Sequence, residues 1–200
     1  MTWEEVSGGT VILSTGSFEQ HGPHLPLSTD SLIARAVAVD VADVMGAILG
    51  PALPLGVSPE HMGFAGTITL DMGAFQAMVS QAVESLKKHG FDRVILINGH
   101  GGNNAALLDM EGFDLVNLTT LIKPYDHAGD VETSLMMHIA PELVRQDKIR
   151  EHEFSWPGKD WKDTRDHSES GVLGDPTGAT TDKGEKILAD LVARSLDALS

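Results

Sequence analysis

The chain contains no cysteine among its 200 residues. Disulfide bonds, thiolate metal sites and cysteine nucleophiles are therefore excluded, so any metal ion must be bound by histidine and carboxylate groups. Basic residues are also scarce, with 14 against 29 acidic ones, and the formal net charge is -15. Such a charge repels nucleic-acid phosphates and anionic lipids, so we expect neither nucleic acid nor a membrane as a partner.

Long hydrophobic runs are missing as well. No apolar stretch approaches the roughly 20 residues of a membrane-spanning helix, and residues 1–5 lack the basic start and apolar run of a signal peptide. We therefore expect a cytoplasmic protein. Hydrophobic residues nevertheless make up 42% of the chain, which suits a single compact domain over residues 1–200 with a good core.

What is present is an alternation of strand-like apolar runs with helical patterns. This alternation is typical of an α/β domain with a mostly parallel central sheet. Strands are predicted at residues 10–15, 47–49, 93–98 and 115–122, and helices at residues 29–46, between residues 71 and 90, from residue 130 through 137, and after residue 181. Residues 151–180 are predicted to form a long loop, in which Trp156 and Trp161 either face a substrate or simply pack.

The first polar cluster directly follows the first predicted strand. Glu19 and His21 are separated by one residue, so in an extended backbone their side chains project to the same face. Pro23 and Pro26 bar a regular helix between them and Asp30, so the chain can loop and return Asp30 toward the strand end. An oxygen and a nitrogen ligand on one face, with a second carboxylate close by, indicate a metal site.

Two further clusters follow later strands. His100 lies among glycines that permit a close approach of the main chain to a ligand, and Asp126, His127 and Glu132 lie where the next predicted helix begins. In an open α/β sheet the ligand crevice lies beyond the carboxyl ends of the strands. We therefore expect all three clusters to face the same crevice.

The number of candidate ligands indicates two metal ions. One catalytic zinc usually takes three protein ligands, whereas the clusters supply five candidates, namely Glu19, His21, Asp30, His100 and Glu132. A bridging Asp30 would hold two ions about 3.5–4 Å apart, and a water between them would lose a proton near pH 7 and become the nucleophile. The second ion would polarise the substrate carbonyl, while His127 would shuttle a proton to the departing nitrogen with Asp126 nearby.

Structural interpretations stand beside these catalytic ones. The clusters can form a hydrogen-bonded network that stabilises loops, Glu132 can be a first-turn helix carboxylate, and His127 can orient the third loop. We expect His24 to support the ligands rather than to bind metal. For His61 the sequence leaves two roles open, support of the site and a contact between subunits.

Three sequence blocks carry a resemblance to a known family. They are the run at residues 19–26 continuing to Asp30, the turn at residues 98–100, and the segment at residues 127–134, with further likeness at residues 64–68 and 174–176. Together they resemble the creatininase family of metal-dependent amidohydrolases. The resemblance implies a three-layer α/β/α sandwich, a binuclear centre of zinc, or else manganese or iron, cleavage of a peptide or non-peptide C–N bond, and a homo-oligomer such as a hexamer.

The resemblance also implies a division of the ligands. Glu19 and His100 would serve one ion, His21 the other, and Asp30 would bridge. Creatininase has a metal-binding glutamate at the position of Gly102, so we expect Glu132 to replace it.

The same departure at Gly102 argues against creatinine as the substrate. The glycine-rich form of this turn is more similar to the branches that trim the mycofactocin precursor or remove formyl groups. We thus expect hydrolysis of an amide in a small molecule or short peptide, with peptide trimming, formamide deformylation or metal-dependent binding without catalysis as alternatives.

Overall fold

The computed structural model describes residues 2–6, 8–123, 126–157 and 161–200, and its centre is a parallel sheet with the strand order β2-β1-β3-β4. The strands are β1 (Gly9–Thr15), β2 (Ile48–Leu53), β3 (Phe91–Asn98) and β4 (Asp114–Asn117). Residues 94–97 of β3 are apolar and buried, because helices cover both faces of the sheet.

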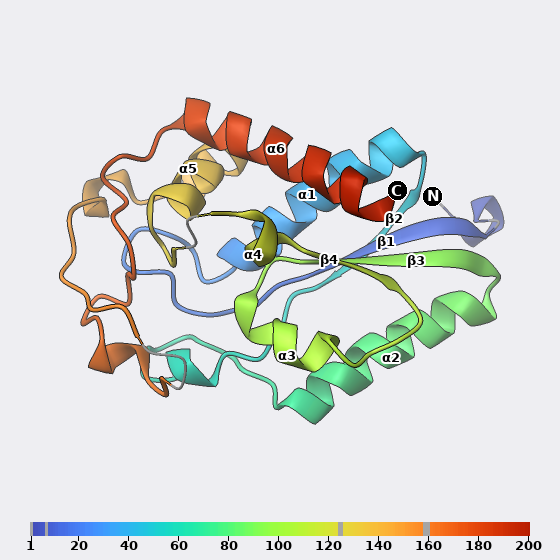
Figure 1. Cartoon of the computed structure of the whole chain (residues 1–200), viewed down its shortest axis with the longest axis horizontal. Coiled ribbons are helices and arrows are strands. Elements are labelled where there is room, and N and C mark those ends of the chain that lie inside the picture. The colour runs from blue at the N-terminus through green and yellow to red at the C-terminus, as the bar shows by residue number, and fades with distance from the viewer. Residues whose placement is uncertain (1, 7, 124–125, 158–160) are drawn as a thin grey trace.

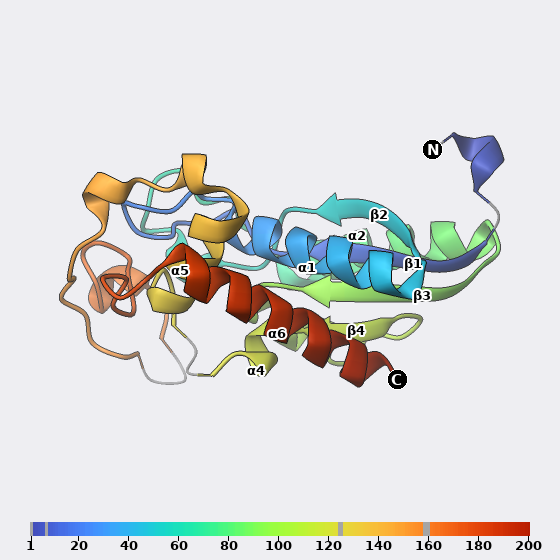
Figure 2. The same cartoon turned by 90° about the horizontal axis from the view of Figure 1, so that it is seen from above.

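Helices form a layer on each side of this sheet (Figures 1 and 2). One layer consists of α1 (Thr29–Met45), α5 (Asp130–Ile139) and α6 (Thr181–Leu199), and the other of α2 (Met72–Lys88) with the short α3 (Asn104–Leu107). Alternate residues of β3 serve the two layers: Ile95 and Ile97 pack with the first, Val94 and Leu96 with the second. The predicted three-layer α/β/α sandwich is confirmed.

The predicted helix ends agree with the structure where the sequence carries a capping residue. Helix α1 ends at Gly46, whose φ of 61° lies in the left-handed region that glycine adopts without strain. The carboxylate of Asp71 accepts a hydrogen bond from the amide of Ala74 and so begins α2. Thr180 caps α6 in the same way through the amide of Lys183.

The prediction of one strand over residues 115–122 was wrong. The chain forms β4 up to Asn117 and then the helical turn α4 (Leu118–Leu121). Strand β4 is an edge strand whose pairing with β3 ends at Asn98 and Asn117, so beyond that point no partner remains for a longer strand. The side chain of Leu118 is buried in the core instead. Thr119 and Thr120, which follow it, lie near the carboxyl end of the sheet.

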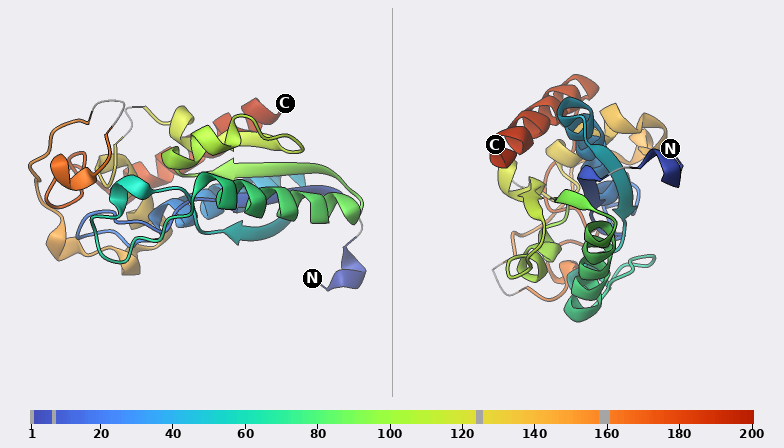
Figure 3. Two further views of the ribbon diagram at one scale, coloured as in Figure 1. Left: turned by 90° about the horizontal axis from the view of Figure 1, so that it is seen from below. Right: turned by 90° about the vertical axis from the view of Figure 1, so that its right-hand side faces the viewer.

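The described parts of the segment between α5 and α6, residues 140–157 and 161–180, are largely irregular, as predicted, and lie beyond the carboxyl ends of the strands (Figure 3). Short 3-10 turns occur here and elsewhere, at Trp3–Glu5, Pro59–His61, Gly101–Asn103, Pro141–Leu143, Gln146–Lys148 and Thr164–Asp166. None of the described helices combines the length and the apolar character that crossing a membrane requires.

Candidate metal centre

The five predicted ligands meet at the carboxyl ends of β1 and β3. Each is at most 7% exposed. They are Glu19 and His21 after β1, Asp30 in the first turn of α1, His100 after β3, and Glu132 in the first turn of α5. The expectation that strand ends gather these residues in one place is therefore met by the geometry.

The ligand atoms form two groups that share one carboxylate. Glu19, Asp30 and His100 make one group, and His21, Asp30 and Glu132 the other, with the ligand atoms of each within 4.8 Å of one another. In the first, Nδ1 of His100 lies 2.8 Å from Oδ2 of Asp30. In the second, Nε2 of His21 lies 3.1 Å from Oδ1 of Asp30 and 3.6 Å from Oε2 of Glu132. The two oxygens of Asp30 thus face different groups, which is the geometry of a bridging carboxylate.

Backbone carbonyls fix the tautomers of both histidines. Nδ1 of His21 lies 3.2 Å from the carbonyl oxygen of Glu19, and Nε2 of His100 lies 3.0 Å from that of Val57. A ring nitrogen that faces a carbonyl oxygen carries a proton, so the opposite nitrogen is the one that can give up its proton and bind a metal ion. In both residues that opposite nitrogen is the one that faces Asp30, as a metal ligand must.

The charges of the cluster also fit divalent cations. Burial opposes a charge on His100, but the carboxylates of Glu19 and Asp30 outweigh it and raise the pKa of the ring to about 10. Burial raises the pKa of Glu19 to about 7. Oε2 of Glu19 and Oδ2 of Asp30 are buried and accept no hydrogen bond of normal geometry. Buried, unsatisfied carboxylate oxygens next to oriented imidazoles are a donor set that zinc, manganese or iron could occupy.

His127 lies beside this cluster and faces Glu19. Its Nδ1 is 3.9 Å from Oε1 of Glu19, and its Nε2 is 3.0 Å from the carbonyl oxygen of Gln20. Burial, with the neighbouring rings of His21 and His61, lowers the pKa of His127 well below its ordinary value. A third group of possible ligand atoms joins it to Glu19 and His21, so the ring is within reach of the same ions or of a substrate bound to them.

The backbone next to His127 is unusual. Ala128 has a φ of 55°, and among the described residues it is the one that is not glycine yet adopts a positive φ. Its amide donates a 2.6 Å hydrogen bond to Oε2 of Glu132. The strained residue is therefore held in place by a predicted metal ligand, which links the orientation of His127 to that of the cluster.

Asp126, the second predicted catalytic residue, lies next to His127 in the chain, but its carboxylate is directed elsewhere. Its Oδ2 accepts a 3.2 Å hydrogen bond from the amide of Val131 at the start of α5, and no hydrogen bond to His127 occurs in the described structure. Burial, together with the nearby charge of Glu132, raises the pKa of Asp126 to about 7. Asp126 therefore shapes the loop that carries His127 rather than contacting its ring.

The expectation that Glu132 compensates for the glycine at position 102 stays a prediction, and the structure places both residues near the cluster. Glu132 belongs to the group of His21, whereas Gly102 lies against His100. A Cβ atom at Gly102 would collide with the carbonyl oxygen of Val57 and come within 2.5 Å of Nε2 of His100. The close approach of the main chain therefore favours glycine at this position, while Glu132 lies in the group expected to serve the second ion.

His61 is the residue that sequence reasoning left undecided. Its Nε2 lies 3.4 Å from Oε1 of Glu19, and its Nδ1 lies 2.9 Å from Nε2 of Gln20 and 2.8 Å from the hydroxyl of Thr164. The ring stacks on that of His127 with centroids 4.5 Å apart. Burial lowers the pKa of His61 to about 3, so the ring is neutral. His24, by contrast, bonds the hydroxyl of Thr133 and lies outside the ligand groups, as expected.

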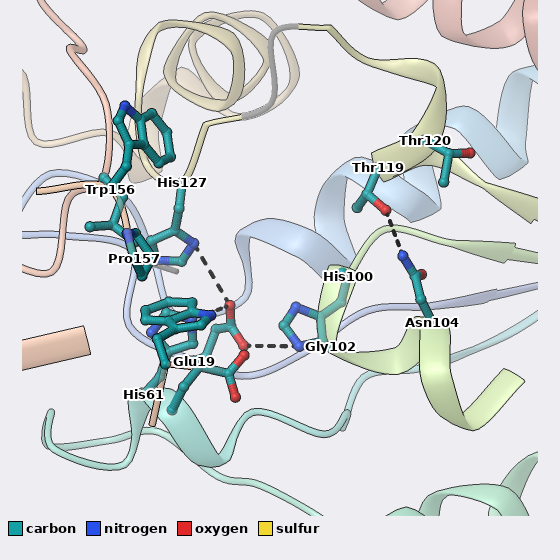
Figure 4. Close-up of a pocket in the computed structure, with 14 residues that line it drawn as sticks. Glu19, His61, His100, Gly102, Asn104, Thr119, Thr120, His127, Trp156 and Pro157 are labelled. Atoms are coloured by element: carbon teal, nitrogen blue, oxygen red, sulfur yellow. Dashed lines mark hydrogen bonds and ion pairs between the residues drawn. The ribbon is translucent and has the colours of Figure 1, made fainter. Parts of the chain in front are cut away.

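A cavity of about 470 Å³ opens over Glu19, His100 and His127 (Figure 4). Its other lining residues are Glu60, His61, Gly101, Gly102, Asn104, Thr119, Thr120, Trp156, Pro157, Trp161 and Leu173. Trp156 and Trp161 therefore face the cavity, which answers the question that the sequence left open about them. Glu19, His100 and His127 form the floor of this cavity. The volume suits a small molecule or part of a peptide.

Together the fold and the cluster define a three-layer α/β/α protein with a buried site able to hold metal ions. A family model described as creatininase, or creatinine amidohydrolase, matches residues 1–199. The chain belongs to the creatininase family.

Individual relatives give the same result. The mycofactocin precursor peptide peptidase of Mycolicibacterium smegmatis is 37% identical over 94% of this chain and 83% of its own length. The creatinine amidohydrolase of Pseudomonas putida is 28% identical over 100% of this chain and 94% of its own length. A solved structure titled "Creatininase Mn" superimposes with a TM-score of 0.84 and 27% identity over 100% of this chain and 95% of that one.

Proposed function

We propose that this chain is a metal-dependent amidohydrolase that binds two divalent ions and hydrolyses an amide C–N bond. Glu19 and His100 would bind one ion, His21 and Glu132 the other, and Asp30 would bridge them. The observation that carries the proposal is the division of Asp30, whose Oδ2 lies 2.8 Å from His100 and whose Oδ1 lies 3.1 Å from His21. Zinc is the first candidate, with manganese and iron as alternatives.

Divalent ions bound there would supply Lewis acidity, which polarises a substrate carbonyl and lowers the pKa of water to about 7. The ring of His127 is neutral at that pH because burial lowers its pKa, so it can accept a proton from the attacking water. It can then release the proton to the departing nitrogen. The carbonyl oxygen of Gln20, 3.0 Å from Nε2 of the ring, keeps the imidazole directed at the cavity.

The amide is expected in a small molecule or a short peptide. Identity to the peptidase that acts on the mycofactocin precursor is 37%, against 28% to the creatinine amidohydrolase. Removal of a short segment from a modified precursor peptide is therefore the second candidate function. Formamide deformylation and metal binding without catalysis are the alternatives that a test has to separate from these two.

Elemental analysis and a substrate screen on the purified full chain test the proposal. We expect close to two divalent ions per chain, and hydrolysis of an amide, peptide or formamide that stops on chelation and returns when metal is restored. Hydrolysis that persists after complete metal removal would contradict metal dependence. Two bound ions with no hydrolysis of any of the three substrate classes would favour the binding protein.

Three accompanying expectations belong to the same proposal. The chain would function as one domain over residues 1–200, in the cytoplasm, and as a homo-oligomer such as a hexamer. Light scattering on the metal-loaded protein tests the assembly, and a mass equal to that of one chain at micromolar concentration would contradict it.

A further inference from the structure

The cavity over the cluster has two walls of different chemistry. Trp156, Pro157 and Trp161, from the segment between α5 and α6, form an aromatic and apolar wall together with Leu173. The opposite wall is polar and consists of Asn104, at the start of α3, with Thr119 and Thr120 of α4. Figure 4 shows Trp156 and Pro157 on one side of the floor and the two threonines with Asn104 on the other.

His127 belongs to the aromatic side. Its ring stacks on His61 at 4.5 Å, and His61 in turn makes an edge contact with the indole of Trp161 at 5.7 Å. Its backbone pairs with that of Leu173, another residue of the same wall. Trp156 is 58% exposed, and among the described aromatic pairs its ring contacts that of Phe154 alone. An uncovered apolar surface therefore faces the cavity.

His100 belongs to the polar side. The residues that follow it lead directly into Asn104, whose Nδ2 donates a 3.3 Å hydrogen bond to the hydroxyl oxygen of Thr119. Since that oxygen accepts from Asn104, the hydroxyl hydrogen of Thr119 is free to point toward a bound molecule. Thr120 is already engaged, because its hydroxyl donates to the carbonyl of Asn117.

These placements determine how an amide would lie, given the proposed function on which this step rests. In hydrolysis the oxygen of water bonds to the carbonyl carbon, the C–N bond breaks, and the nitrogen leaves with the electron pair and takes up a proton. His127 supplies that proton only to a nitrogen on its own side of the floor. The substituent on the nitrogen must then extend along the aromatic wall, and the acyl part along the polar wall.

We propose that the cavity is a two-sided substrate site, in which Trp156 and Trp161 bind an apolar group carried by the amide nitrogen and Thr119 hydrogen-bonds the acyl part. The charge of the lining agrees with this assignment. Glu60 lines the cavity, and none of its described lining residues is lysine or arginine. Away from the proposed ions, the cavity wall therefore offers a carboxylate to a cationic amine product and no cationic side chain to an additional anionic group on the substrate.

Indole fluorescence tests the binding preference without requiring turnover. The chain has three tryptophans, and Trp3→Phe leaves the two in the cavity as reporters. Two probes with the same charge, phenylalaninamide and serinamide, are titrated against the metal-loaded Trp3→Phe protein. We expect phenylalaninamide to bind roughly 10-fold more tightly, and the difference to disappear in the Trp3→Phe, Trp156→Leu variant, which retains Trp161 as its reporter. Equal binding of the two probes, or no response to either, would overturn the proposal.

A pair of capped dipeptides of equal composition tests the orientation. N-acetyl-seryl-phenylalaninamide carries the aromatic group on the nitrogen side of its central amide, and N-acetyl-phenylalanyl-serinamide carries it on the acyl side. We expect kcat/KM to favour the first peptide by roughly 10-fold. Thr119→Val should reduce this preference, because it removes the hydroxyl that is proposed to bond the acyl part of the substrate. A reversed or absent preference would overturn the orientation. If neither peptide is cleaved while phenylalaninamide still binds selectively, the proposed function fails and the apolar subsite stands.

Discussion

Glu19 has a histidine next to each of its two carboxylate oxygens, and the two histidines differ in charge. Nε2 of His100 lies 3.3 Å from Oε2, and Nε2 of His61 lies 3.4 Å from Oε1. Burial opposes a positive charge on both rings. On His100 the carboxylates of Glu19 and Asp30 prevail and raise the pKa to about 10, whereas on His61 burial and the neighbouring cationic rings lower the pKa to about 3.

The difference in pKa between His100 and His61 shows how the single carboxylate of Glu19 can lie between a site suited to metal binding and a site suited to proton transfer. Asp30 touches His100 but not His61, so the negative charge that favours a cation is concentrated on one side of Glu19. A ring that attracts a proton for this reason attracts a divalent ion for the same reason. The other side, with His61 and His127, stays neutral and suits the transfer of protons. We call these the metal side and the neutral side.

Removing the shared carboxylate should have the largest effect on the metal side. Asp30→Asn keeps the shape of the side chain but removes the charge that both groups use, so we expect neither ion to be retained and hydrolysis to be lost. The loss of metal affinity should exceed the roughly 10–100-fold typical of an outer-shell partner. Asp43→Asn, an exposed change on the same helix, is the control. Normal metal content by elemental analysis in Asp30→Asn would show that this residue is no ligand.

On the neutral side the prediction separates metal content from rate. His127→Gln should keep both ions, because its ring lies outside the two groups that share Asp30. Its turnover should fall on the order of 10²–10⁴-fold, as expected when a general acid or base is removed. His100→Gln is the matched change on the metal side and should lose mainly one ion. If His127→Gln lost metal to the same extent, the third ligand group of Glu19, His21 and His127 would be the functional one.

A smaller effect is expected where the main chain presses on His100. Gly102→Ala adds a Cβ that collides with the carbonyl of Val57, the group that fixes the tautomer of His100. We expect a loss of about 1–3 kcal/mol in the free energy of unfolding, typical of overpacking, and weaker binding at the metal side. Gly73→Ala in α2 is the control, because its Cβ would meet nothing closer than 3.4 Å. Denaturant unfolding of the two variants measures the difference, and equal stability would refute the steric argument.

The sequence predicted the metal side better than the neutral side, and the topology explains why. Glu19, His21 and His100 directly follow strands, and parallel strands share the edge at which they end, so local patterns were sufficient to bring them together. His61 lies in a 3-10 turn after β2, and its position depends on Thr164, which is 103 residues away. No periodicity or spacing carries that contact.

The same limit applies to Asp126 and to residues 118–121. Asp126 is adjacent to His127 in sequence, which suggested a catalytic role beside it, but the carboxylate of Asp126 bonds the amide of Val131 at the start of α5. Residues 118–121 have the composition of a strand and lack only a neighbour with which to pair. In both places the outcome is decided by what packs around the segment rather than by its residues.

The last predicted effect concerns the charge of His61 and appears only in the pH dependence of stability. In the metal-free protein its pKa is about 3, against an ordinary value of 6.5. Between these values the unfolded chain binds one more proton at this ring than the folded chain does, so this residue makes the free energy of unfolding rise with pH. One proton corresponds to about 1.4 kcal/mol per pH unit. His61→Gln should therefore reduce the slope of stability against pH by about that amount between pH 4 and 6, while above pH 7 the slope should equal that of the parent.

Urea unfolding at several pH values in the presence of a chelator measures both slopes. His138→Gln, which changes a partly exposed histidine of α5, is the control for replacing a histidine away from Glu19. A slope in His61→Gln that matches the parent would mean that this ring is charged in the folded protein, and the contrast between the two sides of Glu19 would then fail.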